Sequence, residues 1–269
     1  MSSDPDELSS LVTECDKEPI HLLGKIQNHG FMVILDSAGV VTYLSKNASH
    51  YLNDSATDLM GSLFWERLDR PQIHAIRSAH SQAVILGKSV YLHSISVPFS
   101  DNIFDLCIHQ SGEFVVIEFE SGELTGKYDG LVSALMTQMS VTVELNDLYK
   151  GVVESVRTAT GFDRVMIYQF LTDGSGEVIA ESAHSDTSTF LGLRYPASDI
   201  PRQARALYKK NLIRTISDVN GETHPIMGRE GETVTSIDLS SSRLRAVSEI
   251  HIQYLKNMGV GASMSISLI

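Results

Sequence analysis

Asp199 lies between two prolines, Pro196 and Pro201, in the segment RYPASDIPRQARALY (residues 194–208). Each proline holds its own φ near about −65° and biases the residue before it toward an extended conformation, so the segment fixes the position of one carboxylate. Apolar residues recur at helical spacing beyond Pro201 and predict a helix that begins near that proline. On this segment alone, the simplest interpretation is that Asp199 stabilises the positive end of the helix.

Basic side chains gather in and just after the same segment. They could form a solvated helix face, or they could bind an anion. The whole chain has 33 acidic and 21 basic side chains and a net charge of −12, which opposes general attraction to nucleic acid or to anionic lipid. We therefore expect no nucleic-acid partner and no membrane partner. The clustered residues are Arg202, Arg205, Lys209, Lys210 and Arg214.

The two cysteines differ in their surroundings. Cys107 lies in the apolar, strand-like run NIFDLCIHQ, which is typical of a small core residue. Cys15 lies in the polar run VTECDKEP, where no core would require it. Two cysteines in a protein of the cytoplasm do not predict a disulfide, so the Cys15 thiol is either incidental or reactive.

Composition and length predict a soluble globular protein. Hydrophobic residues make up 42% and charged residues 20% of the 269 residues, enough for one large domain or two of ordinary size. No apolar run approaches the ~20 residues that cross a bilayer. The polar start MSSDPDELSS does not resemble a secretory signal, so we expect the protein in the cytoplasm.

Sequence motifs of catalysis and of metal binding are missing. The chain has no phosphate-binding loop, no His-Glu-x-x-His, no Gly-x-Ser-x-Gly and no Cys-x-x-Cys, and GVGASM lacks the third glycine of a dinucleotide fingerprint. The ten histidines show no metal-ligand spacing. The pattern favours a binding or sensing module over an enzyme and predicts no metal site.

The hydrophobic pattern predicts an α+β protein. In the first half, short helices near residues 48–53, 56–61 and 73–87 separate two strands from three later ones, which predicts one antiparallel sheet ending near Glu120. The five strands are expected at residues 30–36, 39–45, 89–99, 103–112 and 113–120.

The second half predicts another set of helices and strands. A long helix is expected over residues 129–160 and stops at Gly161, and a polar stretch covers residues 220–242. The last predicted strand reaches Ile269, so the sheet should continue and we expect a fragment of a longer protein. The other expected elements are a hairpin of strands 163–171 and 177–184, a strand at 212–219, a helix at 242–259 and a strand at 262–269.

Four segments together resemble the photosensory core of the bacterial phytochromes (bacteriophytochromes). They are CDKEPIHLLGKIQNHG, FDRVMIYQF, RYPASDIPRQARALY and LRAVSEIHIQYLKNMGVGASMSIS, in the order that the family keeps. The resemblance implies a PAS domain plus a GAF domain, each an antiparallel sheet flanked by helices. It also implies a knotted N-terminal arm that passes through a loop in the polar stretch 220–242. The expected bounds are 1–18 for the arm, 19–120 for PAS and 121–269 for a C-terminally incomplete GAF domain.

The resemblance also implies a pocket for a linear tetrapyrrole (bilin). In the family, the aspartate at Asp199 turns its backbone carbonyl toward the pyrrole N–H groups, and its carboxylate helps select the photoproduct. The histidine at His251 stacks near the inner rings, and the arginines at Arg214 and Arg245 bind the propionates. The other implied contacts are Tyr168, Tyr195 and Tyr208 around the D-ring, Ser248, Tyr254, Ser263 and Ser265 near the propionates and water, and Met166 and Ile200 elsewhere along the bilin.

The position of the attachment cysteine selects the bilin. Plant-type phytochromes carry a cysteine just before the conserved histidine, where this chain has Ile250. Cys15 matches the bacteriophytochrome cysteine of the N-terminal arm, so the resemblance implies biliverdin IXα in thioether linkage to Cys15. Glu249 replaces the usual proline close to His251, and Leu23 and Asn28 replace commoner prolines. The second conserved histidine, the PHY domain and the output module would lie beyond residue 269.

The resemblance implies a red/far-red photoreceptor module in which light rotates the bilin D-ring and so controls an output. We expect a homodimer, no catalysis in this part, and a parent chain that ends in a histidine kinase, a diguanylate cyclase or another output module. Two alternatives remain open here. One is a chromophore-free PAS–GAF sensor of a small ligand, and the other is an engineered near-infrared fluorescent protein.

Overall fold

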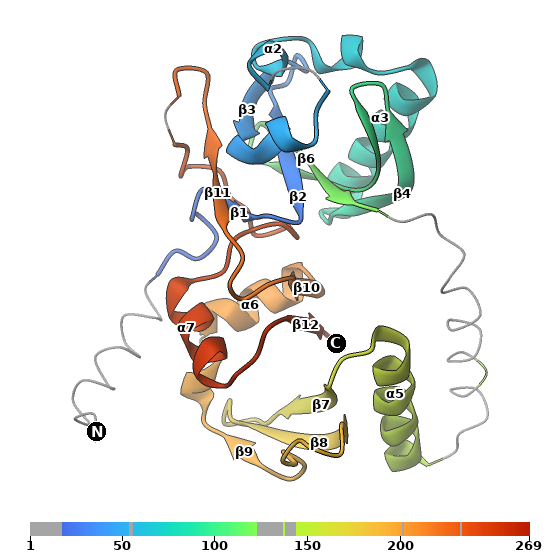
Figure 1. Cartoon of the computed structure of the whole chain (residues 1–269), viewed down its shortest axis with the longest axis vertical. Coiled ribbons are helices and arrows are strands. Elements are labelled where there is room, and N and C mark those ends of the chain that lie inside the picture. Colours follow the sequence, from blue (N-terminus) through green and yellow to red (C-terminus); the bar gives the residue numbers. More distant parts are fainter. Residues whose placement is uncertain (1–17, 54–55, 123–136, 138–143, 201, 232) are drawn as a thin grey trace. The chain divides into compact units, whose positions relative to one another are not determined.

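The chain forms two compact units in the computed structural model, which describes residues 18–53, 56–122, 137, 144–200, 202–231 and 233–269. The first unit comprises residues 1–124 and 202–269, and the second comprises residues 125–201 (Figure 1). Both units combine antiparallel strands with helices, so the α+β class is confirmed. Within the described residues, no helix is long and apolar enough to cross a membrane.

A seven-stranded antiparallel sheet forms the centre of the first unit. All five strands predicted for the first half of the sequence belong to it, and β1 and β11 are additions that the pattern did not predict. The order across the sheet is β1-β11-β3-β2-β6-β5-β4. The bounds are β1 Lys25–Gln27, β2 Gly30–Leu35, β3 Val41–Ser45, β4 Val90–Val97, β5 Ser100–Ser111, β6 Phe114–Ser121 and β11 Thr223–Met227.

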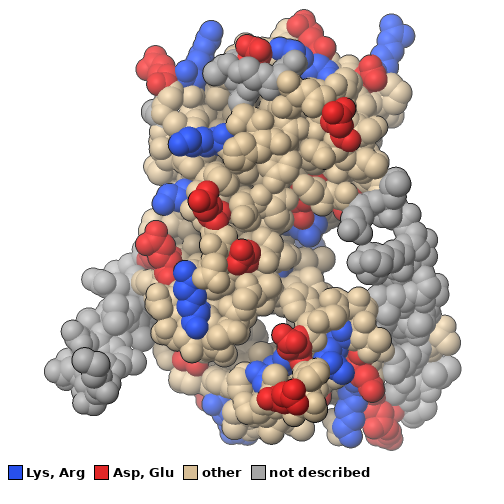
Figure 2. Space-filling view, viewed as in Figure 1, with Lys and Arg blue, Asp and Glu red and all other residues tan. Residues whose placement is uncertain are grey.

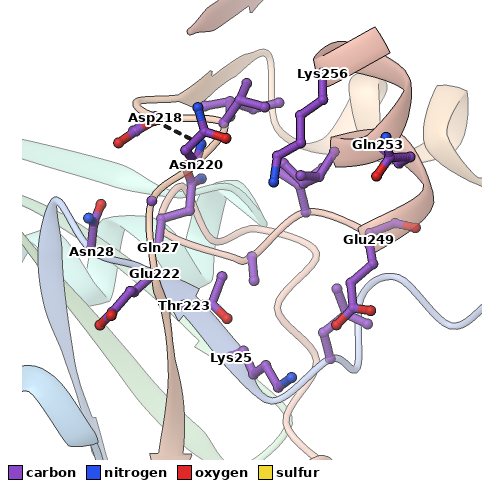
Figure 3. Close-up of a pocket in the computed structure, with 18 of the residues that line it drawn as sticks. Lys25, Gln27, Asn28, Asp218, Asn220, Glu222, Thr223, Glu249, Gln253 and Lys256 are labelled. Carbon is purple, nitrogen blue, oxygen red and sulfur yellow. Dashed lines mark hydrogen bonds between the residues drawn. The ribbon is translucent and has the colours of Figure 1, made fainter. Parts of the chain in front are cut away.

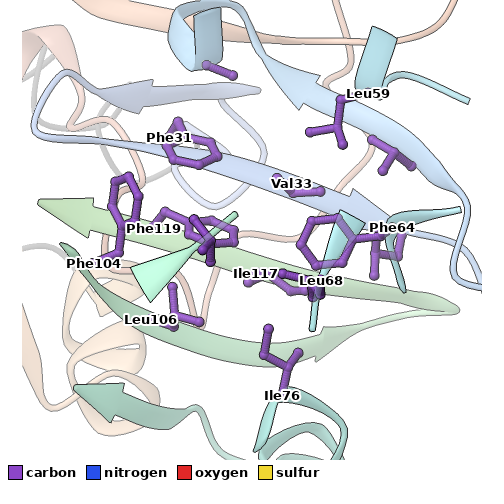
Figure 4. Packing of buried hydrophobic residues seen from close by; sticks show 14 of the residues in the cluster. Phe31, Val33, Leu59, Phe64, Leu68, Ile76, Phe104, Leu106, Ile117 and Phe119 are labelled. Carbon is purple, nitrogen blue, oxygen red and sulfur yellow. The ribbon is translucent and has the colours of Figure 1, made fainter. Parts of the chain in front are cut away.

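Aromatic packing dominates the core on one face of this sheet (Figure 4). The rings of Phe31 and Phe119 stack with centroids 4.5 Å apart, and Phe104 meets Phe31 edge-on at 5.5 Å. All three are fully buried, and each contributes about 1.5–3 kcal/mol by burial. Helix α3 (Arg70–Leu86) lies beside β4 and β5. The short helices are η1 Lys46–His50, α2 Ala56–Leu59 and η2 Phe64–Arg67.

Strand β1 is held between two segments of one loop. On one side it pairs with β11, where Ile26 lies opposite His224. On the other side the amide of Gln27 donates to the carbonyl of Leu244 at 2.8 Å, and the amide of Ala246 donates to the carbonyl of Lys25 at 2.9 Å. The loop of residues 223–246, which we call the clasp loop, therefore encloses the N-terminal segment. Residues 1–17 lie outside the described residues, so the knot itself stays a prediction.

The clasp loop is tied to the sheet by a single buried carboxylate, that of Glu118 on β6. Oε2 accepts hydrogen bonds from Ser242 Oγ and from the amide of Leu244, both at 2.6 Å, and Oε1 accepts one from the amide of Arg243 at 3.1 Å. Glu118 is 0% exposed. Charge-assisted bonds of this kind satisfy the carboxylate. Burying it without partners would cost about 1–3 kcal/mol or more.

These long-range bonds overturn one prediction. The helix expected over residues 242–259 is wrong in its first half, because α7 spans only Glu249–Asn257. The amides before it bond to Glu118 and to β1, so they cannot donate within a helix. Similarly, the polar stretch 220–242 contains β11, which the pattern hid because Pro225 interrupts it and cannot donate to the ladder.

The rest of the first unit follows the sequence prediction more closely. The helix expected near Pro201 is α6, Arg202–Lys210, although Pro201 itself lies outside the described residues. Strands β10 (Ile213–Ile216) and β12 (Ser263–Ile266) form an antiparallel pair in which Arg214 lies opposite Ser265. This pairing places Arg214, one of the two arginines of the predicted site, beside the strand that carries Ser263 and Ser265.

Within its described residues, the second unit contains a long helix, a short helical turn and a three-stranded sheet. The predicted hairpin is confirmed, and Gly161 ends α5 in a left-handed conformation with φ 72°. The continuous helix expected over residues 129–160 is wrong, because Glu144 is extended at φ −92° and ψ 130°. Most residues before Glu144 lie outside the described part. The elements are α5 Leu145–Thr160, β7 Arg164–Phe170, β8 Gly176–Ala183, β9 Arg194–Tyr195 and η3 Ala197–Asp199.

We predict that His29 makes the first unit less stable in acid. Its Nδ1 lies 2.9 Å from Ser217 Oγ, and burial together with the charge of Arg243 lowers the pKa of His29 below its ordinary 6.5. The unfolded chain then binds a proton that the folded chain rejects, so stability is complete above about pH 6.5 and falls as the pH drops below it. Denaturant midpoints measured from pH 5 to 7 should rise less steeply for His29→Gln than for the wild type. The exposed control His74→Gln should keep the wild-type slope, and equal slopes for His29→Gln would contradict the assignment.

Candidate functional site

Two half-buried guanidinium groups of the first unit form the part of the site with the clearest chemistry. Arg214 on β10 lies with its guanidinium carbon 3.4 Å from the ring centre of Tyr208 on α6. Its Nη2 donates to Ser265 Oγ at 2.6 Å and its Nη1 to the carbonyl of Asn211 at 3.0 Å. The stacked ring and the two acceptors hold the fork of the guanidinium in one orientation.

Arg245 belongs to the clasp loop and is the second cation. Its Nη1 donates to the carbonyl of Ile20 at 2.8 Å, whereas its Nε is buried without a hydrogen-bond partner. Burial lowers the pKa of both guanidinium groups, and the positive charge of Arg245 adds to the effect at Arg214. Among the described residues, neither group forms an ion pair with a carboxylate. Two neighbouring cations of this kind fit a ligand that carries carboxylates.

Serines lie beside Arg214 and before α7. Ser263 and Ser265 lie on β12, and Ser267 follows, with its hydroxyl 3.4 Å from Arg214 Nη1. Ser248 precedes α7 and donates through its hydroxyl to Glu18 at 2.6 Å. The resemblance did not include Ser267, although its alternate spacing with Ser263 and Ser265 was visible in the sequence.

His251 and Tyr254 share one face of α7. Their rings lie nearly parallel, with centroids 6.1 Å apart, as expected for positions i and i+3. Burial lowers the pKa of His251, so the imidazole is neutral near pH 7 and can both donate and accept a hydrogen bond. Glu249 is exposed and stands two positions earlier, where side chains do not face each other on a helix. Its carboxylate is therefore directed away from His251.

The second unit contains an aromatic cluster that includes two of the predicted tyrosines. Tyr168 on β7 lies 6.1 Å from Tyr195 on β9 and 5.3 Å from Phe170, measured between ring centroids. Gly176 on β8 lies opposite Tyr195 and leaves room for the Tyr168 ring. Met166 occupies the same strand and is 43% exposed. Phe170 was not predicted, although it continues the alternation of Met166 and Tyr168.

Asp199 ends a single helical turn in the second unit. The amide of Asp199 donates to the carbonyl of Pro196 at 3.1 Å, and Pro196 has φ −66°. Ile200 returns to an extended conformation with φ −125°. Neighbouring atoms partly dehydrate the carboxyl and raise the pKa of Asp199. Pro196 thus restricts the start of this turn, as the sequence suggested, whereas Pro201 lies outside the described residues.

The predicted residues therefore fall into two groups and one remainder. The first unit holds eight of them and the second unit holds five. Cys15 lies outside the described residues. The first group is Tyr208, Arg214, Arg245, Ser248, His251, Tyr254, Ser263 and Ser265; the second is Met166, Tyr168, Tyr195, Asp199 and Ile200.

A cavity of about 570 Å³ opens between β1, the start of the clasp loop and α7 (Figure 3). Lys25 and Lys256 line it together with acidic side chains, among them Glu249. Its lining includes Glu18, Ser248 and Ile250 but neither His251 nor Tyr254, which belong to the other face of α7. The cavity is thus adjacent to the predicted site and not identical with it.

Charged side chains of both signs lie on the described surface. Figure 2 shows acidic and basic side chains interspersed on the face in view. Of the basic cluster seen in the sequence, Arg202, Lys209 and Lys210 are exposed on α6, whereas Arg214 is stacked on Tyr208. The exposed members form a solvated helix face, and anion binding by Arg214 stays a prediction.

Comparison with known proteins identifies the two domains of the chain and its family. Residues 15–122 match the family model of the PAS fold, and residues 144–269 match that of the GAF domain. The protein is thus a paired PAS–GAF module. The chromophore-binding domain of Stigmatella aurantiaca phytochrome P1 is 36% identical with a TM-score of 0.81, and the match covers 95% of this chain and 86% of that one. The chain belongs to the phytochrome family.

Longer relatives show the same membership. The bacteriophytochrome of Pseudomonas aeruginosa is 37% identical over 96% of this chain and 35% of its own length. The phytochrome-like protein Cph1 of Synechocystis is 37% identical over 93% of this chain and 35% of its own length. The chain therefore spans about a third of the curated relatives that it matches.

We predict that Gly176→Ala displaces the Tyr168 ring. A Cβ at this position would lie 2.1 Å from Tyr168 Cζ, far inside van der Waals contact. The variant should lose about 1–3 kcal/mol of unfolding free energy, measured by denaturant titration. Gly261→Ala is the matched control, because a Cβ there meets no atom within 4 Å. Equal losses for the two variants would contradict the close packing of Tyr168 on Gly176.

Proposed function

We propose that this chain is the bilin-binding, light-sensing module of a red/far-red photoreceptor, and that its bilin is biliverdin IXα. The observation that carries the proposal is the pair Arg214 and Arg245. The two cations are half-buried, have no carboxylate partner among the described residues, and leave the buried Nε of Arg245 unsatisfied. The two propionates of a bilin supply the charge and the acceptors that this arrangement needs. When bound, the bilin supplies the light absorption and the double bond that isomerises.

The chain's own residues divide the remaining work. Arg214 and Arg245 would anchor the propionates, and Ser265 already shares a hydrogen bond with Arg214. The neutral imidazole of His251 can accept and return a proton at the pyrrole nitrogens. The backbone carbonyl of Asp199, held by its proline-bounded turn, would accept from the pyrrole N–H groups. The aromatic cluster of Tyr168 and Tyr195 would contact the D-ring.

Covalent attachment is proposed at Cys15. Glu18 is fixed by its 2.6 Å bond to Ser248, and it lies only three residues after Cys15. An extended chain advances at most about 3.6 Å per residue, so Cys15 is confined to within about 11 Å of Glu18. Ile250, which stands at the other attachment position of the family, lines the same cavity as Glu18. This reach supports a thioether at Cys15, with Ile250 unable to form one.

The wider assembly is also proposed, by analogy with the longer relatives. A homodimer, a PHY domain and an output module such as a histidine kinase or diguanylate cyclase would belong to the whole protein, and the cytoplasm is its expected location. Catalysis is assigned to that output and not to the PAS–GAF module. Neither a chromophore-free ligand sensor nor an engineered fluorescent protein is favoured by the phytochrome relatives.

We predict that the double variant Arg214→Gln/Arg245→Gln weakens biliverdin binding by at least about tenfold, since each charge-assisted contact contributes about 1.5–3 kcal/mol. Red absorbance would be followed as biliverdin is titrated into the apoprotein. The exposed control Arg202→Gln should bind as the wild type does. A wild-type chain that develops no red band with biliverdin would refute the function itself, and unchanged affinity in the double variant would refute the role of the arginines.

We predict that Cys15→Ala loses the covalent link but keeps noncovalent binding, because the cations and the aromatic cluster remain. After denaturing electrophoresis, pigment should migrate with the wild-type chain and be absent from the Cys15→Ala band. Cys107→Ala removes the other cysteine and serves as the control that retains pigment. Pigment on the Cys15→Ala band would place the linkage elsewhere.

A further inference from the structure

Three buried side chains that the bilin site does not use meet on the clasp-loop face of the large sheet. Cys107 and His109 alternate on β5 and so point to one face, and Glu118 on β6 lies directly opposite Cys107 in the register. The three are 1%, 2% and 0% exposed. One sulfur, one nitrogen and one oxygen from them lie within 4.8 Å of one another.

Hydrogen bonds from the clasp loop satisfy the Glu118 carboxylate, but none satisfies the imidazole of His109. Both ring nitrogens of His109 are buried without a hydrogen-bond partner. His109 Nδ1 lies 3.6 Å from Glu118 Oε1, beyond the about 2.7–3.2 Å of an N–H···O bond. Among the described residues, no lysine or arginine forms an ion pair with Glu118. A fully buried carboxylate thus lies beside an imidazole whose ring nitrogens have no hydrogen-bond partner, which is the arrangement that a cation between them would satisfy.

We propose that Cys107, His109 and Glu118 bind a zinc ion between the large sheet and the clasp loop. Thiolate, imidazole and carboxylate are the ligands that zinc prefers, and with Zn²⁺ their charges sum to zero. Tetrahedral zinc holds such ligand atoms about 3.3–3.6 Å apart, so the 3.6 Å pair already fits and the sulfur needs a small side-chain rotation. On binding, the Cys107 thiol releases its proton to solvent, and no electron is transferred.

The surroundings support the ion and give it a structural consequence. Ser242 Oγ and the amides of Arg243 and Leu244 already orient the Glu118 carboxylate, as outer-shell donors do at metal sites. The ion would therefore bind the sheet on one side and, through Glu118, fix the clasp loop on the other. The amino-acid sequence does not reveal this site, because Cys-x-His alone is too short a motif to indicate a metal ion. Glu118 is brought next to Cys107 only by the pairing of β5 with β6.

The test uses the apoprotein without an affinity tag and without bilin, because a tag or a bilin itself binds metal ions. The chain is unfolded in chelator and refolded with one equivalent of Zn²⁺ or Co²⁺, because the site has no exposed ligand through which to load. We expect close to one metal ion per chain after desalting, thiolate-to-Co²⁺ charge-transfer absorption in the near ultraviolet, and a higher thermal midpoint with Zn²⁺ than with chelator.

Variants then assign the ligands. Cys107→Ala should abolish the charge-transfer band and His109→Gln should lower metal retention, whereas the controls Cys15→Ala and His74→Gln should match the wild type. The proposal would be overturned if the wild-type chain retained no metal, showed no charge-transfer band and had the same thermal midpoint in Zn²⁺ and in chelator. This result does not depend on whether the variants fold. Metal retained equally by Cys107→Ala would also overturn it, as binding elsewhere.

Discussion

The buried carboxylate of Glu118 is the constraint on which the arrangement of the first unit depends. It is fully buried and accepts three hydrogen bonds from residues 242–244, more than a hundred positions later in the chain. An unsatisfied carboxylate in this place would be costly, so the carboxylate and the clasp loop require each other. With its amides committed to Glu118 and to β1, the segment before Glu249 stays extended and α7 begins late.

The same hydrogen bonds position residues of the predicted site. Arg245 follows directly after the residues that bond to Glu118, and it reaches back to the carbonyl of Ile20 in the N-terminal segment. Ser248 then holds Glu18, which limits how far Cys15 can lie from α7. The clasp loop therefore carries Arg245, one of the two half-buried cations, and leads directly to the start of α7, the helix that carries His251. In a photoreceptor, such shared support would let a change at the bilin reach the large sheet.

Local pattern predicted the elements whose pairing is local, and missed those whose pairing is not. The five strands of the first half and the 163–171 and 177–184 hairpin alternate clearly, and the structure contains them. Strand β11 failed because it is short, contains Pro225 and gains its partners from β1 and β3, some 180–200 residues earlier. The helix over 242–259 failed because helical periodicity says nothing of a carboxylate on another strand that competes for its amides. Of the site, residue chemistry alone indicated the restrained Asp199 and the basic cluster; the remaining contacts came from the resemblance to phytochromes, and their roles toward the bilin stay predictions.

Hydrogen–deuterium exchange, read by amide, tests the clasp most directly. In the wild type, the amides of Gln27 and Ala246 should exchange as slowly as those of the β2–β6 pair, because they bond across β1 to the clasp loop. In Glu118→Gln, whose side-chain amide cannot accept all three hydrogen bonds, protection at Gln27 and Ala246 should fall by an order of magnitude or more while the β4–β5 pair stays protected. Fast exchange of Gln27 and Ala246 in the wild type, or unchanged protection there in Glu118→Gln, would contradict the claim that Glu118 holds the clasp loop around the N-terminal segment.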